Sequence, residues 1–431
     1  MQRLNIKTII CLLLTMVYAI HASAQEIEFE EEDFIPDSLL MEQVPQKFSF
    51  INYDADSLSF PAGISDDFMT LLWKLADIKD GADVKINMIH IGGSHVQADI
   101  FSNRVRTNFS KNFAPATGSR GCLFPFATLN TNAPSTYRLK TTGKWDGARN
   151  ISNKENIPLG IMGAAIRTSD PTATVSLQLN TGRDSVQYDF NKITILGSST
   201  SFDIIPVVIC NGVEYTTEID PSFSSYSCRI PYPASECTII FKGISQGGSF
   251  TLRGIIPESD KPGVTYTACG VNGASVPKWL KCDLFTEELK LHTPELAIFA
   301  IGINDASSLG FKPEVFKEGY RKLLAEFKEA NPNCCFIFIT NNDCFLNLSS
   351  SGKYINPNTE SVRKAFIELA EETQGAVFDV YGIMGGKGSS NKWVRAGLMN
   401  SDHVHFLRPG YNLLGDMLFN AINNEIEKQI P

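Results

Sequence analysis

Residues 85–109 carry the feature that most constrains the fold, an apolar strand that stops at two glycines and restarts as a helix. The strand is marked by an apolar run of strand length, formed by Ile86, Met88, Ile89 and Ile91. The helix is marked by apolar residues that fall near one face, Val96, Ile100, Val105 and Phe109. Between them, Gly92 and Gly93 predict a tight turn with Ser94 at the carboxyl end of the strand. A serine there suits a nucleophile whose own N–H helps to bind an oxyanion, although capping of the helix is the alternative role.

The first 24 residues form a predicted signal peptide. Arg3 and Lys7 precede an apolar run over residues 9–20, and Ala22-Ser23-Ala24 fits a small-residue cleavage site. The run is too short for a comfortable membrane span, and no later segment is apolar enough to cross a bilayer. We therefore expect an exported mature chain that begins at Gln25 and has no transmembrane segment.

Composition excludes several classes of function. The net charge is −9, and no Lys/Arg cluster of the kind that reads nucleic acid is present, so no nucleic-acid partner is expected. Nine cysteines remain after cleavage without CxxC spacing, which argues against a disulfide-dependent scaffold and leaves disulfide pairing open. A metal site would combine His403 and His405 with His95, but no closed ligand set accompanies them. We expect no metal and no cofactor, and the oligomeric state is open.

Changes in the pattern of apolar, polar and turn-forming residues divide the mature chain into four parts. Residues 25–60 are acidic at first and then irregular, which indicates a solvated leader. Over residues 131–261, short alternating strands are separated by Gly, Asn, Ser and Pro turns, which predicts an inserted all-β, sandwich-like domain. The flanking residues 61–130 and 262–431 alternate strands with helices, which predicts one α/β domain with a parallel sheet.

The apolar patterns of the two flanking parts predict individual elements. Amphipathic helices are expected over residues 66–80, 312–330, 360–372 and 411–426. Strands are expected over residues 86–91, 264–268, 296–301, 336–339 and 377–380. In sheets of this kind, binding and catalytic sites lie at the carboxyl ends of the strands.

Polar or glycine-rich segments follow several of these strands. They are Gly92-Gly93-Ser94, Gly270–Ser275 and Gly302–Asp305, and the last loop adds Asp402 and His405 just before the final helix. Each has a structural alternative, as a cap, a turn or a surface pair. Their shared position at strand ends predicts a single site.

With these four segments the chain resembles the SGNH, or GDSL-type, hydrolases. The four family blocks are matched by Gly92-Gly93-Ser94, Gly270–Ser275, Gly302-x-Asn304-Asp305 and Asp402-x-x-His405. The resemblance implies a flavodoxin-like α/β/α sandwich in which Ser94 is the nucleophile and His405, oriented by Asp402, is the general base. It also implies an oxyanion hole formed by the amides of Ser94 and Gly273 and the side chain of Asn304.

Gly93 departs from the family pattern. The first block usually reads Gly-Asp-Ser, and by resemblance the Asp helps to hold the serine turn. Glycine accepts any backbone angle that the turn needs, yet loosens it. The departure leaves two interpretations open, an active site and a degenerate site that only binds.

The stretches HIGGSHVQAD and GVNGAS are most similar to those of exported bacterial O-acetylesterases of peptidoglycan and other polysaccharides, which also carry an inserted β module. This resemblance implies a periplasmic or cell-surface serine esterase that removes O-acetyl groups from a carbohydrate through an acyl-serine intermediate. Aromatic residues of the insert, with Tyr215, Phe223 and Tyr226 among the candidates, would stack on sugar rings if exposed, the alternative being that they are core. Acetyl transfer to a sugar and a catalytically degenerate carbohydrate-binding protein are the alternative functions.

Overall fold

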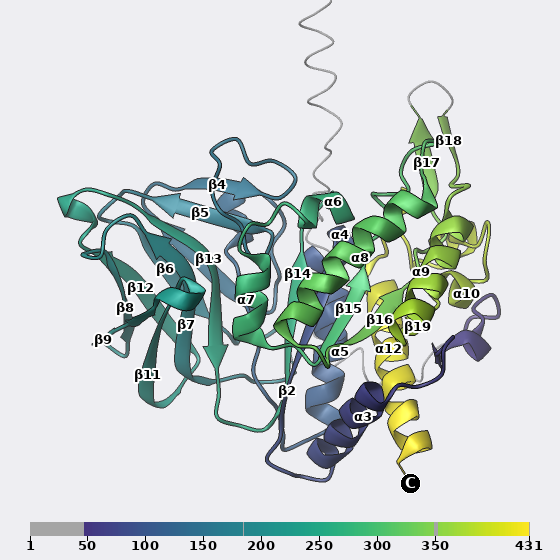
Figure 1. Cartoon of the computed structure of the whole chain (residues 1–431), viewed down its shortest axis with the longest axis horizontal. Coiled ribbons are helices and arrows are strands. Elements are labelled where there is room, and N and C mark those ends of the chain that lie inside the picture. Colours follow the sequence, from purple (N-terminus) through teal and green to yellow (C-terminus); the bar gives the residue numbers. More distant parts are fainter. Residues whose placement is uncertain (1–46, 184, 349–351, 431) are drawn as a thin grey trace, which may run out of the picture. The chain divides into compact units, whose positions relative to one another are not determined.

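A six-stranded sheet in the order β1-β19-β16-β15-β2-β14 supports the α/β part of the chain (Figure 1). Its strands are β1 (Leu58–Ser59), β2 (Lys85–Gly92), β14 (Gly263–Gly270), β15 (Leu296–Ala300), β16 (Cys335–Ile339) and β19 (Ala376–Phe378). From β19 to β14 all neighbours pair in parallel, as the sequence predicts, and β1 adds an antiparallel edge. The computed structural model describes residues 47–183, 185–348 and 352–430. The predicted signal peptide and residues 25–46 of the leader lie outside these ranges.

Helices cover both faces of this sheet. One face carries α3 (Asp66–Lys79), α5 (Ile100–Asn112) and α12 (Arg408–Gln429), and the other carries α7 (Phe285–His292), α8 (Pro313–Ala330) and α9 (Thr359–Thr373). In β15, Leu296 and Ile298 join the first core and the alternate residues Ala297 and Phe299 join the second, which is the period of two expected for a strand buried on both faces. The α/β/α sandwich implied by the resemblance is therefore confirmed.

Shorter elements complete this part of the fold. They are η1 (Tyr53–Ala55), α4 (Ser94–Gln97), η2 (Phe126–Leu129), α6 (Val276–Trp279), α10 (Val380–Met384), α11 (Ser390–Arg395) and the hairpin of β17 (Phe345–Leu348) and β18 (Gly352–Ile355). Within the described ranges, no helix combines the length and apolar character that a membrane span needs.

The strands between α5 and β14 form two antiparallel sheets, in the orders β10-β11-β7-β13-β5-β4 and β3-β6-β12-β8-β9. Their strands are β3 (Arg138–Thr142), β4 (Asp146–Arg149), β5 (Ala164–Thr168), β6 (Thr174–Gln178), β7 (Phe190–Ser199), β8 (Ile205–Cys210), β9 (Val213–Thr216), β10 (Glu218–Asp220), β11 (Ser225–Ala234), β12 (Glu236–Lys242) and β13 (Phe250–Glu258), with η3 (Pro221–Phe223) and η4 (Ile244–Gln246) between them. The expected all-β insert is confirmed, and its boundaries at 131 and 261 stay a prediction.

One proposed sugar-stacking residue of the insert is in its core. Tyr226 is 4% exposed and packs its ring against Phe250, so it is not available to a glycan. Its hydroxyl bonds Ser199, which satisfies the polar end of a buried tyrosine. Tyr215 and Phe223 are partly buried. Of the two alternatives left open for Tyr226, sugar stacking and core packing, the structure therefore supports core packing.

The insert and the α/β part share one core and one buried ion pair. Arg253 in β13 donates from Nε to Glu288 Oε1 of α7 at 2.5 Å, and neither side chain is exposed to solvent. The other oxygen of Glu288 accepts from the Ile161 amide of the insert at 2.9 Å. Apolar residues of the insert belong to the same core cluster as α7, α8 and α9. The insert is thus a packed part of the molecule.

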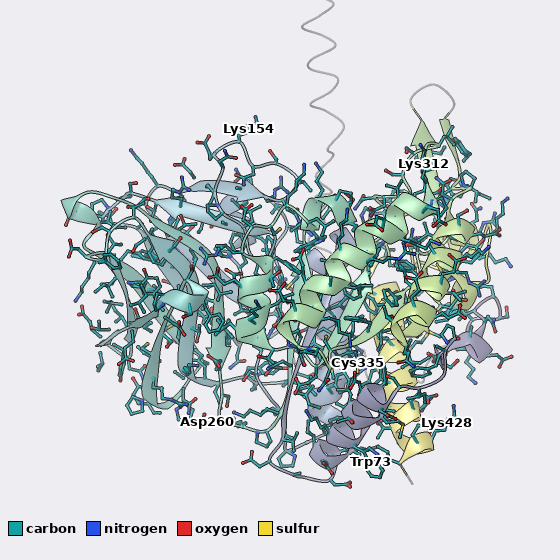
Figure 2. All side chains as sticks on the ribbon, viewed as in Figure 1. Trp73, Lys154, Asp260, Lys312, Cys335 and Lys428 are labelled. Atoms are coloured by element: carbon teal, nitrogen blue, oxygen red, sulfur yellow. The ribbon has the colours of Figure 1, made fainter. Side chains whose placement is uncertain are left out.

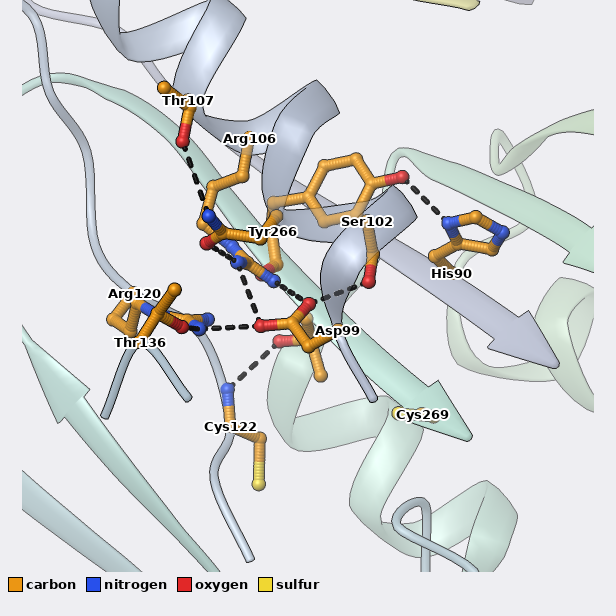
Figure 3. Close-up of polar contacts among 12 residues, drawn as sticks. His90, Asp99, Ser102, Arg106, Thr107, Arg120, Cys122, Thr136, Tyr266 and Cys269 are labelled. Carbon is orange, nitrogen blue, oxygen red and sulfur yellow. Dashed lines mark hydrogen bonds and ion pairs between the residues drawn. The ribbon is translucent and has the colours of Figure 1, made fainter. Parts of the chain in front are cut away.

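A helix break at Asp99 separates α4 from α5, where the sequence predicts one continuous helical pattern. Asp99 has a left-handed φ of 55°. Its carboxylate accepts from Arg106 at 3.0 and 3.1 Å, from Arg120 at 2.5 Å and from Ser102 at 2.5 Å (Figure 3). Burial raises the pKa of this carboxyl, but the two arginines lower it to about 2. This buried charge cluster stabilises a corner that sequence periodicity alone does not show.

The cysteines of the described residues are all free thiols. Cys334 and Cys335 are both buried and serve core packing, Cys335 as the first residue of β16 (Figure 2). Burial raises the pKa of the Cys335 thiol to about 12, so the thiolate is disfavoured at neutral pH.

Candidate active site

Close packing shapes the turn that presents Ser94. A Cβ atom on Gly92 would lie 2.2 Å from Val96 Cγ2, and one on Gly270 of β14 would lie 2.2 Å from the Gln97 amide. Only glycine fits at either position, since real Cβ atoms do not approach other atoms so closely. The two glycines let α4 fold back onto β2 and β14, and Ser94 is the first residue of that helix.

The structure brings Ser94, His405 and Asp402 into one hydrogen-bonded chain. Ser94 Oγ lies 2.7 Å from His405 Nε2, although 311 positions separate the two residues. On the other side of the ring, His405 Nδ1 lies 2.7 Å from Asp402 Oδ2. The side chains of His405 and Asp402 are 21% and 30% exposed, so the site is open to solvent. A carboxylate on Nδ1 favours the tautomer in which Nε2 accepts the serine proton.

Backbone hydrogen bonds orient Asp402 in its loop. Asp402 Oδ1 accepts from the amides of Val404 at 2.7 Å and His405 at 2.9 Å, which leaves Oδ2 for the His405 ring. Burial raises the pKa of Asp402, but the hydrogen bond from the His405 ring and the two amides lower it to about 2. His403 adopts a left-handed φ of 60° and stacks its ring on Phe345 at 4.1 Å. His403 therefore supports the loop, with its ring stacked on the hairpin.

The candidate oxyanion donors surround the same turn. Asn304 Nδ2 donates to Ala274 O at 2.8 Å and would lie 3.2 Å from a Cβ on Gly93. An amide has two N–H bonds, so one remains for a ligand. Gly273 is exposed at a φ of 79°, and the flanking Val271 and Ala274 carbonyls would lie 3.8 and 3.6 Å from the same Cβ. The loops of Gly273 and Asn304 thus flank the serine turn.

The glycine at 93 is not required by a left-handed backbone, because its φ is −100°. An aspartate at this position would instead have to fit its side chain between the Asn304 amide and two carbonyl groups. The turn is therefore held by its neighbours rather than by a side chain of its own.

Two further histidines flank the serine. His90 is fully buried and its Nδ1 bonds the Tyr266 hydroxyl at 2.9 Å, so it is a hydrogen-bonded core residue. His95 Nδ1 bonds the Tyr411 hydroxyl at 2.7 Å, and its ring centroid lies 5.5 Å from that of His405. Burial lowers the pKa of His95 to about 3, and nearby His405 adds to the effect. His95 is thus a neutral support beside the His405 ring. No group of potential metal ligands is present in the described ranges.

Sequence reasoning gave no role to two polar residues of the site, Gln97 and Asp305. Gln97 is 2% exposed and bonds the Asn272 amide from Oε1 at 2.7 Å. Asp305 accepts from the Val276 amide at 3.0 Å at the start of α6, and burial raises its pKa to about 6. The only sequence signal for Gln97 is a polar residue next to the apolar Val96. That signal becomes informative only when the distant hydrogen-bond partners of Gln97 are known.

Comparison with known proteins agrees with the fold. Residues 255–413 match the GDSL-like Lipase/Acylhydrolase family. A solved structure of a peptidoglycan O-acetylesterase is 18% identical, has a TM-score of 0.69, and the match covers 88% of this chain and 99% of that one. A family two carbohydrate esterase from Cellvibrio japonicus is 10% identical with a TM-score of 0.28, and the match covers 68% of this chain and 99% of that one. A search of curated proteins finds no match. The similarity to the first structure shows that the chain has the SGNH-hydrolase fold.

Proposed function

We propose that this chain, an SGNH-fold protein whose residues 255–413 match the GDSL-like Lipase/Acylhydrolase family, is a serine esterase that uses Ser94, His405 and Asp402. The observation that carries the proposal is the hydrogen-bonded chain from Ser94 Oγ through the His405 ring to Asp402. A serine, a histidine and a carboxylate joined in this order form the arrangement that activates a serine nucleophile.

The chemistry follows from this arrangement. Ser94 Oγ attacks the ester carbonyl while His405 Nε2 takes its proton, and Asp402 stabilises the charged ring. The amides of Ser94 and Gly273 and the free N–H of Asn304 bind the oxyanion. His405 then protonates the leaving alcohol, which departs and leaves an acyl-serine. Water then attacks the acyl group as His405 takes its proton, and His405 returns that proton to Ser94 Oγ as the acid leaves.

We propose O-acetylated carbohydrate, such as peptidoglycan or another polysaccharide, as the substrate class. Support comes from the likeness of 88% of this chain to a protein described as a peptidoglycan O-acetylesterase. The partial exposure of His405 and Asp402 fits a substrate that is part of a polymer, because an open site admits a group held on a large chain. We also propose export to the periplasm or cell surface, on the pattern of residues 1–24.

The first experiment compares wild type with Ser94→Ala on 4-nitrophenyl acetate. We expect wild type to turn over and the variant to fall to the buffer rate. Ser222→Ala, at an exposed serine of the insert, is the matched control and should keep wild-type activity. A fluorophosphonate should label wild type once, at Ser94. A wild type as inert as Ser94→Ala would disprove the esterase proposal and favour the binding protein.

The second experiment measures acetate released from O-acetylated peptidoglycan, with chemically de-acetylated peptidoglycan as the blank. Release of free acetate that depends on Ser94 supports hydrolysis. Acetyl groups that appear on an added sugar acceptor, without free acetate, would identify a transferase. Activity on 4-nitrophenyl acetate with no release from the polymer would disprove the substrate class while leaving the esterase intact.

A further inference from the structure

We infer that Gln97 is a positioning residue that holds the loop of Gly273, and with it one oxyanion N–H, against the helix that carries Ser94. The inference rests on the proposed esterase function and adds a residue that the SGNH blocks do not include. Gln97 touches none of the reacting atoms. It acts through a hydrogen-bond network with three other residues, Thr131, Asn132 and Asn272.

Both ends of the Gln97 amide are used. Its Oε1 accepts from the Asn272 amide at 2.7 Å, and its Nε2 donates to Thr131 Oγ1 at 2.9 Å and to Asn132 O and Oδ1 at 2.7 Å. The residue is 2% exposed. A buried amide with partners on both ends fixes its neighbours, because each broken bond would leave an unsatisfied polar group.

The network joins the two halves of the site. Ser94 is the first residue of α4 and Gln97 is the last, so one helical turn connects the nucleophile to the network. Asn272 immediately precedes Gly273 in the chain. A bond to the Asn272 amide therefore restrains the backbone one residue before the proposed oxyanion donor.

Asn132 closes the network from a third segment. Its Oδ1 accepts from Gln97 Nε2 at 2.7 Å and from Asn272 Nδ2 at 2.6 Å. The side chain of Gln97 thus bonds the backbone of Asn272, and the side chain of Asn132 bonds the side chains of both. This arrangement provides a brace for the turn that Gly93 cannot supply, since glycine has no side chain to offer.

The test removes the brace and follows the chemistry. Gln97→Met keeps the length of the side chain and loses every hydrogen bond. Asn132→Ala removes the shared acceptor, and Asn132→Asp restores it. Thr217→Val is the matched control, because it removes a buried 2.7 Å bond to Pro206 O within the insert. For each we measure kcat and KM on 4-nitrophenyl acetate, the rate of inactivation by a fluorophosphonate, and Tm.

We expect Gln97→Met and Asn132→Ala to lower kcat and the inactivation rate by about tenfold to a hundredfold, since a misplaced oxyanion donor costs about that much. KM should change little, because the loss falls on the transition state. Asn132→Asp should recover most of the loss. Thr217→Val should lower Tm without changing kcat.

The outcomes distinguish a failure of this inference from a failure of the proposed esterase function. Wild-type kcat and inactivation rate in either Gln97→Met or Asn132→Ala would overturn the positioning role, and Asn132→Ala decides the matter if Gln97→Met does not fold. A fall in Tm with unchanged kcat, as in Thr217→Val, would likewise show a role in stability alone. A wild type as inert as Ser94→Ala would instead overturn the esterase proposal.

Discussion

At the residue scale, Gly93 is the position where one added side chain would test whether the Asn304 amide serves as an oxyanion donor. A Cβ there would lie 3.2 Å from Asn304 Nδ2, tight enough that the amide must shift by a few tenths of an ångström. The carboxylate of Gly93→Asp would face the Ala274 and Val271 carbonyls and draw the Asn304 amide toward itself. An amide that donates to the introduced carboxylate would no longer serve an oxyanion.

We therefore predict that Gly93→Asp lowers kcat on 4-nitrophenyl acetate by about tenfold, as partial loss of one oxyanion donor would. Gly93→Ala, which adds only the Cβ, is the control and should lose less. Steady-state kinetics of the three proteins, with Ser94→Ala as the blank, provide the measurement. A rise in kcat for Gly93→Asp would mean that the carboxylate braces the turn and that Asn304 is not needed where it now lies.

Single residues were predictable from the sequence only where local patterns determine their environment. The core position of His90 follows from its place inside the apolar strand, and Ser94 and His405 lie in hydrogen-bond contact as the motif order indicates. Their roles as nucleophile and base stay a prediction. Gln97 escaped notice because its partners, Asn132 and Asn272, are far away in the chain, and a lone polar residue near an apolar face has many ordinary explanations.

At the element scale, the helices and strands that apolar patterns predict in the α/β part are present within a few residues, whereas the shorter α6, α7, α10, α11, β1, β17 and β18 were not predicted. A further difference is the break between α4 and α5. Periodicity records which face is buried, and that face continues from Val96 to Phe109 across the break. The corner depends instead on charges that meet Asp99 from Arg106 and, 21 positions away, from Arg120. Pair interactions over that separation leave no periodic signal.

This corner yields a stability prediction. Asn tolerates the left-handed backbone, so Asp99→Asn removes the charge and keeps the φ of 55°. Arg106 and Arg120 would then be buried without a counter-charge, and we expect a loss of about 3–5 kcal/mol in the free energy of unfolding. Urea denaturation followed by circular dichroism measures it.

The matched control is Asp416→Asn, which breaks the partly exposed pair with Arg104 on the other side of α5. A pair in contact with solvent contributes about 1 kcal/mol or less. Equal losses in the two variants would show that burial of the Asp99 cluster does not set its contribution.

At the scale of the whole molecule, the insert and the α/β part behave as one core. Arg253 and Glu288 meet with no exposure, and apolar residues from both parts form a continuous cluster. The prediction of a separate inserted domain rests on a change in the pattern of apolar residues along the chain. Such a pattern indicates secondary structure, but it does not show whether the two parts share a core. In the sequence, a solvated boundary between the two parts cannot be told from a buried one until the partners of Glu288 are known.

We predict that the mature protein unfolds in a single thermal transition, because separating the parts would expose this core and an unpaired buried ion pair. Differential scanning calorimetry should give equal calorimetric and van't Hoff enthalpies. Two resolved transitions, or a soluble folded protein after deletion of residues 131–261, would contradict it. In either case the insert would be an independent module.

The place of β2 in the sheet has a consequence for how the molecule forms. β2 lies between β14 and β15, and Lys85 pairs with Gly263 of β14 while Met88 pairs with Leu296 of β15. Both neighbours follow the insert in the chain, so the strand that leads to Ser94 has no partner while the ribosome makes residues 93–262. Pairings over such separations are slow to form, whereas the antiparallel strands of the insert can pair earlier with nearby segments. His405 is made later still, 311 positions after Ser94. The candidate nucleophile Ser94 is therefore made long before its hydrogen-bond partner, and the hydrogen-bonded chain of the proposed site can form only after His405 has been made.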